Sequence, residues 1–257
     1  MSLQSLFIPF STIVIKEVSR FVRIWVQTIV PPAISMTLYF VIFGSLIGPR
    51  IGTMNGFAYI DYIAPGIIMM SIINNAYANV VSSFYGAKFQ RHIEEMLVAP
   101  IPNFIILAGY VTGGVVRGFL VGVIVTIVAL FFTDLHLHSF TITIAVVLMT
   151  SVVFSLAGMI NAIFANKFDD ISIIPTFVLT PLIYLGGVFY SIDLLPEFWQ
   201  KVSAFNPILY MVNAFRYGML GESDISISHA FIMLIVFTIT LLIISLQLLN
   251  RGVGIKS

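Results

Sequence analysis

The sequence predicts an all-α integral membrane protein with six transmembrane helices, and three observations support this fold class. Asp, Glu, Lys and Arg make up only 9% of the 257 residues, whereas soluble domains contain roughly 25%. The mean hydropathy is +1.06. The stretches 24–49, 62–87 and 225–250 contain no Asp, Glu, Lys or Arg, and each is 26 residues long. Because about 20 helical residues cross the hydrocarbon core, each stretch is long enough to span a membrane.

The first predicted element is an amphipathic helix over residues 10–25. Lys16, Arg20 and Arg23 fall on one face of this helix, while apolar side chains recur at helical spacing on another face. A basic face opposite an apolar face is typical of a helix that lies in the membrane interface. The alternative is that these residues form the beginning of a longer first span.

Six spans follow, and the distribution of basic residues sets their orientation. The predicted boundaries are 24–48, 62–85, 101–132, 140–165, 171–190 and 230–249. With the N-terminus inside, eight basic residues are cytoplasmic and three are external, which agrees with the positive-inside rule. The cytoplasmic set is Lys16, Arg20, Arg23, Lys88, Arg91, Lys167, Arg251 and Lys256, and the external set is Arg50, Lys201 and Arg216. We therefore expect both termini in the cytoplasm.

Two segments between the spans differ in composition from the rest. Residues 88–100, KFQRHIEEMLVAP, predict a short charged amphipathic helix on the cytoplasmic side, between the second and third spans. Residues 191–224 contain an uncharged run, 202–215, that is too short to cross a membrane but suits a re-entrant or interfacial helix. We expect an outer re-entrant helical hairpin before the last span, and one membrane domain over residues 1–257.

Polar residues mark the second span. Asn75 and Asn79 are four residues apart and therefore share one helix face. Amide side chains in hydrocarbon need partners, so this face is expected to meet other helices or a hydrated path. Hydrogen bonding between helices, without any contact to a transported molecule, explains the pattern equally well.

Small residues mark the third span. Gly114, Gly118 and Gly122 form a ladder that permits close helix packing, either within the subunit or across a dimer interface. Arg117 lies among these glycines and is expected to reach the membrane interface or to pair with an acidic residue. The fifth span contains two prolines, which remove backbone donors and bend a helix. This bend is either a gate or a static kink.

Several function classes are excluded or disfavoured by what the sequence lacks. The net charge of +1 gives no nucleic-acid footprint, and the chain contains no cysteine, no P-loop and no recognisable metal motif. No clustered Asp, His or Ser residues suggest a lipid-modifying enzyme. No span carries the string of buried carboxylates that is typical of proton- or sodium-coupled carriers. Any uphill transport is therefore expected to draw its energy from another chain.

Two stretches carry a family resemblance that covers essentially the whole chain. They are FQRHIEEMLVAPIP (89–102) and PLIYLGGVFYSIDLLPEFWQKVSAFNPILYMVNAFRYGMLG (181–221), in which the pattern GGVFY…LLP…W…NP..Y…R is specific. Together with the order of spans, they make the chain resemble the ABC-2 type permeases, the membrane subunits of bacterial ATP-binding-cassette exporters. This resemblance implies the inner membrane as the location and a substrate path between two copies of the permease.

The resemblance also implies a role for each segment. Residues 88–100 would be the coupling helix that docks on a separate ATPase subunit, which binds ATP and Mg²⁺, so that this chain has no catalytic, cofactor or metal site. The expected ATPase-coupling residues are Phe89, Arg91, Ile93, Glu94, Glu95, Met96 and Leu97. Spans one, two and five would line the path, which brings Asn75, Asn79, Thr176 and Thr180 near an exported molecule of unspecified chemistry.

Two alternatives stay open at this point. Residues 88–100 also fit a solvated loop helix that binds no partner. The whole chain also fits an ATP-independent channel or secondary carrier.

Overall fold

The computed structural model describes residues 3–254, and the side chains of residues 3–5 and 97 lie outside that description. The described chain is mostly helical. A two-stranded antiparallel sheet pairs Thr53 with Ala58 and Met54 with Phe57. The elements are α1 (Leu3–Arg23), α2 (Trp25–Tyr39), the π-helix η1 (Phe40–Ile47), α3 (Gly48–Ile51), β1 (Thr53–Met54), β2 (Phe57–Ala58), α4 (Tyr59–Phe89), α5 (His92–Val98), α6 (Asn103–Ala129), α7 (Phe140–Phe164), α8 (Asp170–Ile174), the π-helix η2 (Pro175–Leu179), α9 (Thr180–Tyr184), the 3₁₀ turn η3 (Ile192–Leu194), α10 (Glu197–Ala204), α11 (Pro207–Leu220) and α12 (Ile227–Arg251).

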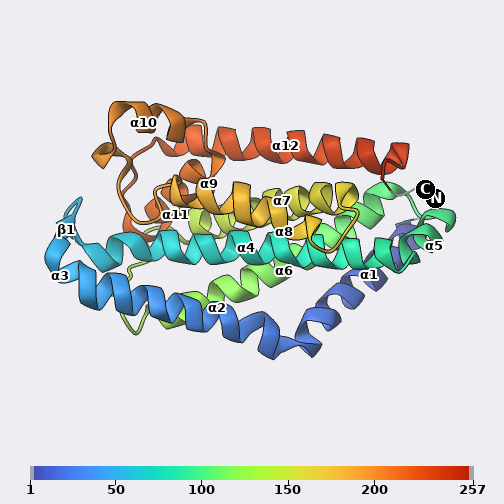
Figure 1. Cartoon of the computed structure of the whole chain (residues 1–257), viewed down its shortest axis with the longest axis horizontal. Helices are drawn as coiled ribbons and strands as arrows, with labels where there is room; N and C mark the ends of the chain where they lie inside the picture. The colour runs from blue at the N-terminus through green and yellow to red at the C-terminus, as the bar shows by residue number, and fades with distance from the viewer. Residues whose placement is uncertain (1–2, 255–257) are drawn as a thin grey trace.

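The long helices form one bundle around α4 (Figure 1). Helix α4 packs against α6, α7, α11 and α2, and most of its side chains are buried. Helix α5 and both ends of the described chain lie at one end of the bundle, which we call the α5 end. The elements α3, β1 and α10 lie at the opposite end, which we call the hairpin end (Figure 1).

Five helical segments among residues 3–254 are long and apolar enough to cross a membrane. They are Trp25–Ile51, Tyr59–Phe89, Asn103–Ala129, Phe140–Phe164 and Ile227–Arg251. The multi-pass, all-α membrane fold predicted from the sequence is therefore confirmed. The predicted count of six spans is not reached by these length and hydropathy criteria.

The expected fifth span is a shorter helix. Segments α8, η2 and α9 form one helical run, Asp170–Tyr184, of 15 residues. At about 1.5 Å per residue, this run is roughly 22 Å long and falls short of the ~30 Å hydrocarbon core. Prolines at 175 and 181 remove backbone donors, and the run ends in the turn that contains Gly187, whose φ is +71°.

The turn before α8 is held by an acidic side chain. One carboxylate oxygen of Asp170, Oδ2, accepts backbone hydrogen bonds from Asn166 at 2.8 Å and from Lys167 at 2.9 Å. These two N–H groups stabilise the charged carboxylate and hold the pKa of Asp170 below its usual value. Asp170 therefore fixes the direction in which the chain leaves α7.

The N-terminal helix α1 is separate from α2. The chain breaks at Ile24, with φ −106° and ψ 36°, and Thr28 Oγ1 bridges the break by donating to Phe21 O at 3.2 Å. Helix α1 packs along α6 and buries Ile13 and Phe21. It runs from Leu3 to Arg23, so it begins earlier than the predicted range 10–25.

A helical hairpin, α10 and α11, precedes α12. Asn206 caps α11 by accepting a hydrogen bond from Ile208 N at 3.0 Å, and its Nδ2 donates to Leu182 O at 2.6 Å. The asparagine of the NP motif thus starts one helix and ties it to the preceding α9. Helix α11 is largely buried against α4, α7 and α12.

A fully buried arginine joins this hairpin to α4. Arg216 Nη2 donates to Gly187 O at 2.6 Å, and its guanidinium lies 4.0 Å from the ring centroid of Tyr62. Arg216 Nη1 lies 3.8 Å from Asp224 Oδ2, and both side chains are buried. The hydroxyl of Tyr62 in turn donates to Asp224 at 3.2 Å. The GG and R positions of the sequence motif are therefore in direct contact.

The glycine ladder of α6 packs within the subunit. A methyl group added at Gly122 would lie 2.8 Å from Ile72 Cγ1 of α4, and one added at Gly118 would lie 3.0 Å from Ser151 Oγ of α7. An added methyl at Gly114 would overlap Ser155 Oγ of α7. The ladder therefore lets α6 approach α4 and α7 closely, and its partner helices belong to the same chain.

Candidate functional site

Helix α4 has one line of side chains that its neighbours leave uncovered. Residues Asn74, Ala78, Ser82 and Gly86 recur every fourth position and are exposed or half-buried, whereas most other residues of α4 are buried. We call these four residues the open face of α4. Its polar and small side chains contrast with α12, where large apolar side chains such as Ile232, Val236 and Ile239 are exposed.

Two segments flank α4 and meet at the hairpin end. Figure 1 draws α2 on one side of α4, and α8 with α9 on the other. Phe189 stacks on Tyr39 and Phe43, with ring centroids 5.6 Å and 4.9 Å apart, and Tyr184 lies 5.9 Å from the same ring. These four aromatic side chains, which we call the aromatic cluster, join the second half of the first span to the end of α9 and the turn that follows it.

The path residues chosen from the sequence divide into two groups. Asn75 and Asn79 are buried, with Asn75 Oδ1 accepting from Arg117 at 3.2 Å and Asn79 Oδ1 accepting from Arg20 at 2.8 Å. Thr176 and Thr180 are exposed.

The two asparagines therefore do not lie on the open face, and their place beside a transport path stays a prediction. Their spacing places both asparagines on one helix face. In the structure their side-chain oxygens accept hydrogen bonds from one arginine of α6 and one of α1. The neighbouring Asn74 is the amide that the packing leaves uncovered.

Among the described residues, Arg117 does not pair with an acidic residue, which was one of the two environments expected for it. Its Nη2 contacts Asn75 Oδ1 at 3.2 Å, so its hydrogen-bond partner is an amide and not a carboxylate. The side chain is half-buried between α6 and α4. A neutral partner satisfies one donor of a buried guanidinium but does not neutralise its charge.

A buried carboxylate, which the sequence did not predict as a site residue, links α1 to α4. Glu17 is fully buried; Ser83 Oγ donates to its Oε1 at 2.5 Å, and Arg20 Nη2 lies 3.3 Å from its Oε2. Lys16 Nζ lies 3.8 Å from Oε1 and 3.3 Å from the hydroxyl of Tyr110. The available signal was an acidic residue at i, i+3 from an arginine inside an otherwise basic face.

The charged segment 88–100 forms α5, a helix of seven residues. Ile93 is fully buried, and Met96 is partly buried against the core. Phe89 is 61% exposed, Val98 is 87% exposed, and Glu94 and Glu95 are exposed in the first turn. The side chain of Leu97 lies outside the described residues.

Ile93 therefore anchors α5 to its own chain and offers no surface to a second chain, in contrast to the expected contact role. A seven-residue helix has little stability of its own, so an apolar side chain must hold it on the bundle. Val98, which the sequence reading did not select, takes the outward position instead.

The backbone on both sides of α5 restricts the direction of this helix relative to α4 and α6. Helix α4 ends at Phe89, and Arg91 adopts a left-handed conformation with φ +62°. After α5, Pro100 and Pro102 lead into α6, which begins at Asn103. Helix α5 is thus a short rigid link between two long helices of the bundle.

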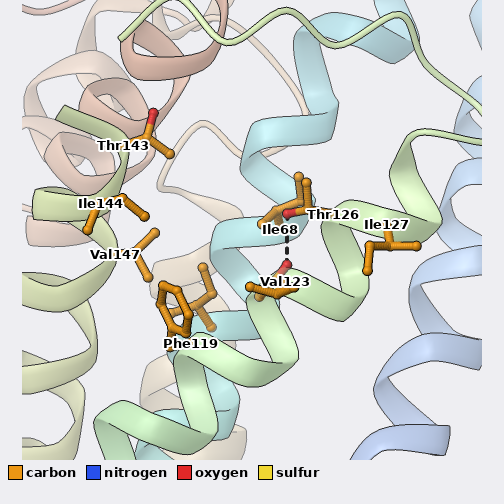
Figure 2. A pocket seen from close by; sticks show the side chains of 10 residues that line it. Ile68, Phe119, Val123, Thr126, Ile127, Thr143, Ile144 and Val147 are labelled. Atoms are coloured by element: carbon orange, nitrogen blue, oxygen red, sulfur yellow. Dashed lines mark hydrogen bonds between the residues drawn. The ribbon is translucent and has the colours of Figure 1, made fainter. Parts of the chain in front are cut away.

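A separate hollow lies on the opposite side of α4. It has a volume of about 180 Å³ and is lined by α4, α6 and α7, with Ile68, Phe119 and Val147 among the lining side chains (Figure 2). Its two hydroxyl groups, Thr126 and Thr143, donate to carbonyl groups of their own helices. The hollow therefore presents an apolar wall, which suits an acyl chain or a packed side chain better than a hydrated path.

Comparison with known proteins places these features in a family. The family model for ABC-2 type transporters matches residues 9–220. The chain is 59% identical over 242 residues, 94% of each chain, to the inner membrane transport permease YadH of Escherichia coli K12. It is 25% identical over 209 residues, 81% of each chain, to nodulation protein J of Rhizobium leguminosarum bv. viciae. The chain is a multi-pass inner membrane permease, and it belongs to the ABC-2 type transporter family.

Proposed function

We propose that this chain is the membrane-spanning subunit of an ATP-driven exporter, that it works as a homodimer and that it takes its energy from separate ATPase subunits that bind ATP and Mg²⁺. In this arrangement the α5 end is cytoplasmic, both termini are cytoplasmic, and Asp170–Tyr184 acts as a sixth, incomplete span. The family membership and the permease name of the Escherichia coli relative support this proposal.

The observation that carries the proposal is the surface of α5. Phe89, Glu94, Glu95 and Val98 are exposed together at one end of the bundle, while Ile93 holds the same helix rigidly on α4. A helix that is held on the bundle and exposes apolar and acidic side chains is suited to bind in a groove of another protein. The charged side chains would set the register of the two surfaces. Force applied to α5 reaches α6 directly through the segment around Pro100 and Pro102.

The open face of α4 is the best candidate for the path side of the subunit. We expect water, a second subunit or the transported molecule to cover these polar and small residues. Against hydrocarbon, part of the Asn74 amide would have no hydrogen-bond partner. In this proposal a second copy faces it, Thr176 and Thr180 border the path from α8–α9, and the aromatic cluster closes the outer end. The glycines of α6 stay within each subunit.

The test changes Glu94 and Glu95 together to alanine in a complex reconstituted with its ATPase. Removing two rim charges is expected to weaken ATPase binding about tenfold, which is ~1.4 kcal/mol, and to abolish the stimulation of ATP hydrolysis. The matched control is Glu197→Ala with Glu222→Ala, two exposed acidic residues outside α5.

Two results would contradict the proposal. One is normal ATPase binding and stimulation in the Glu94→Ala, Glu95→Ala variant. The other is ion-gradient-driven flux through the purified permease in liposomes that contain no ATPase, which would identify a channel or secondary carrier instead.

A further inference from the structure

A polar cavity lies where α1 crosses the end of α4, close to the beginning of α5. Its volume is about 240 Å³, several times the roughly 30 Å³ that one water molecule occupies in the liquid. We call it the α1–α4 cavity. Its lining combines two cationic side chains, two hydroxyls, an amide and an imidazole: Lys16, Arg20, Ser82, Ser83, Gly86, Ala87, Gln90 and His92.

The charges that face this cavity do not balance. Glu17 is the one carboxylate that the described residues bring to Lys16 and Arg20, at 3.8 Å and 3.3 Å respectively. Its carboxylate is fully buried and already accepts a hydrogen bond from Ser83. Lys16 and Arg20 against one acid leave an excess of positive charge at the wall of the cavity, and the imidazole of His92 adds a further nitrogen to the lining.

Hydrogen-bond donors at this wall are incompletely used. Among the described residues, the hydrogen bonds of Arg20 all run through its Nη2, to Glu17 Oε2 and to the backbone and side-chain oxygens of Asn79. Lys16 Nζ has the hydroxyl of Tyr110 at 3.3 Å, and the Lys16 side chain is 48% exposed. Guanidinium and ammonium groups with free donors bind oxyanions through charge-assisted hydrogen bonds.

The position of the cavity connects it to the open face of α4. Ser82 and Gly86 line the cavity and also belong to that face. A group bound beside Lys16 therefore sits at the α5 end of the line of small and polar residues that continues to Asn74. A ligand held here has an uncovered route along α4 toward the hairpin end.

We propose that the α1–α4 cavity binds a phosphate or pyrophosphate group of the transported molecule and so loads it from the cytoplasmic side. The direction of loading rests on the proposed function, whereas binding of the oxyanion does not. The same chemistry is offered by the headgroup of a lipid and by a free phosphate compound, and the experiment separates these two sources.

The test measures binding to the full-length permease in dodecyl maltoside micelles by microscale thermophoresis. Three probes are compared: inorganic pyrophosphate, dioctanoyl phosphatidic acid and dioctanoyl glycerol. At least one of the two phosphate probes is expected to bind and the uncharged glyceride is not. Binding of the lipid probe alone assigns the site to a headgroup, and binding of pyrophosphate alone assigns it to a soluble anion.

Variants decide whether binding occurs in this cavity. Lys16→Gln is expected to raise the Kd by about tenfold, because one charge-assisted hydrogen bond is lost, and Lys16→Gln with His92→Gln by more. Arg23→Gln is the matched control, since Arg23 is an exposed cation of the same helix that does not line the cavity; its Kd is expected to stay within about twofold.

Two outcomes would overturn the inference. The first is no binding of either phosphate probe at about 1 mM, a concentration at which even a ~4 kcal/mol interaction is detected. The second is an equal loss in Lys16→Gln and Arg23→Gln, which would indicate general attraction to a basic helix. Neither measurement involves an ATPase, so failure here is distinct from failure of the ATP-driven mechanism.

Discussion

The buried contact between Arg216 and Asp224 gives the sharpest prediction of stability. Arg216→Met removes a cation whose Nη1 lies 3.8 Å from Asp224 Oδ2 and a donor that lies 2.6 Å from Gly187 O. The Asp224 side chain is only 2% exposed. Breaking a buried pair on one side leaves an uncompensated charge and costs about 3–5 kcal/mol.

The remaining arms of the experiment separate charge from packing. Asp224→Asn keeps an oxygen that accepts from the hydroxyl of Tyr62 but leaves the fully buried Arg216 charge uncompensated, so we again expect a cost of about 3–5 kcal/mol. In the double variant neither charge is left alone, and its cost is expected to be at least ~1 kcal/mol below the sum of the two single costs. The free energy of unfolding is measured by titrating dodecyl maltoside micelles with sodium dodecyl sulfate.

A matched control and a clear refutation exist for this cycle. Lys201→Met removes an exposed cation of the same hairpin, 72% exposed and paired with the exposed Glu197, and is expected to change stability by less than about 0.5 kcal/mol. The fluorescence of Trp199 in α10 reports unfolding of the hairpin. A cost below ~1 kcal/mol for Arg216→Met, together with additive single costs, would refute the reasoning that this arginine holds the hairpin on α4.

Three further predictions test packing, docking and pH dependence. Gly114→Ala is expected to lower stability by about 1–3 kcal/mol through overpacking. Gly86→Ala is expected to be neutral or stabilising, because a methyl group added there meets nothing within 4 Å. Equal thermal melting of the two variants would contradict this prediction. Ile93→Ala is expected to cost about 2–5 kcal/mol of stability. Val98→Ala is expected to leave thermal melting unchanged and to weaken ATPase binding in a pull-down titration. The reverse pattern would show that Ile93 faces the partner. Because hydrogen bonds lower the pKa of Asp170, its stabilising effect is present above the unfolded pKa of ~3.9 and is lost as pH falls through the folded pKa. Melting of wild type and Asp170→Asn is therefore expected to differ at pH 7 and to converge as the pH falls through the folded pKa of Asp170, and a constant difference would contradict the assignment.

Local patterns in the sequence carried much of the fold. Hydropathy located the five long spans, because crossing a membrane requires a long run of apolar helix whatever its neighbours are. The charged segment 88–100 and the proline-punctuated segment 191–224 were also recognisable, since each breaks the apolar pattern. The length of the fifth helix could not be predicted, because the sequence does not show at which residue a helix interrupted by prolines ends.

The candidate site depended on tertiary contacts. Helical spacing shows that Asn75 and Asn79 share a face, but only packing decides that this face meets Arg117 and Arg20. Likewise, Ile93 fits an exposed or a buried position equally well by spacing alone.

Taken by itself, the sequence determined the class of protein, the approximate spans and the two unusual segments between them. The tertiary structure decided which line of α4 is uncovered, which residue anchors α5, and how Glu17 and Arg216 are neutralised. The physical reason is range: hydropathy and helical periodicity act over a few turns of one helix, whereas the rotation of a helix in a bundle follows from contacts with residues far away in the chain, such as Ser83 with Glu17 at 66 positions' separation.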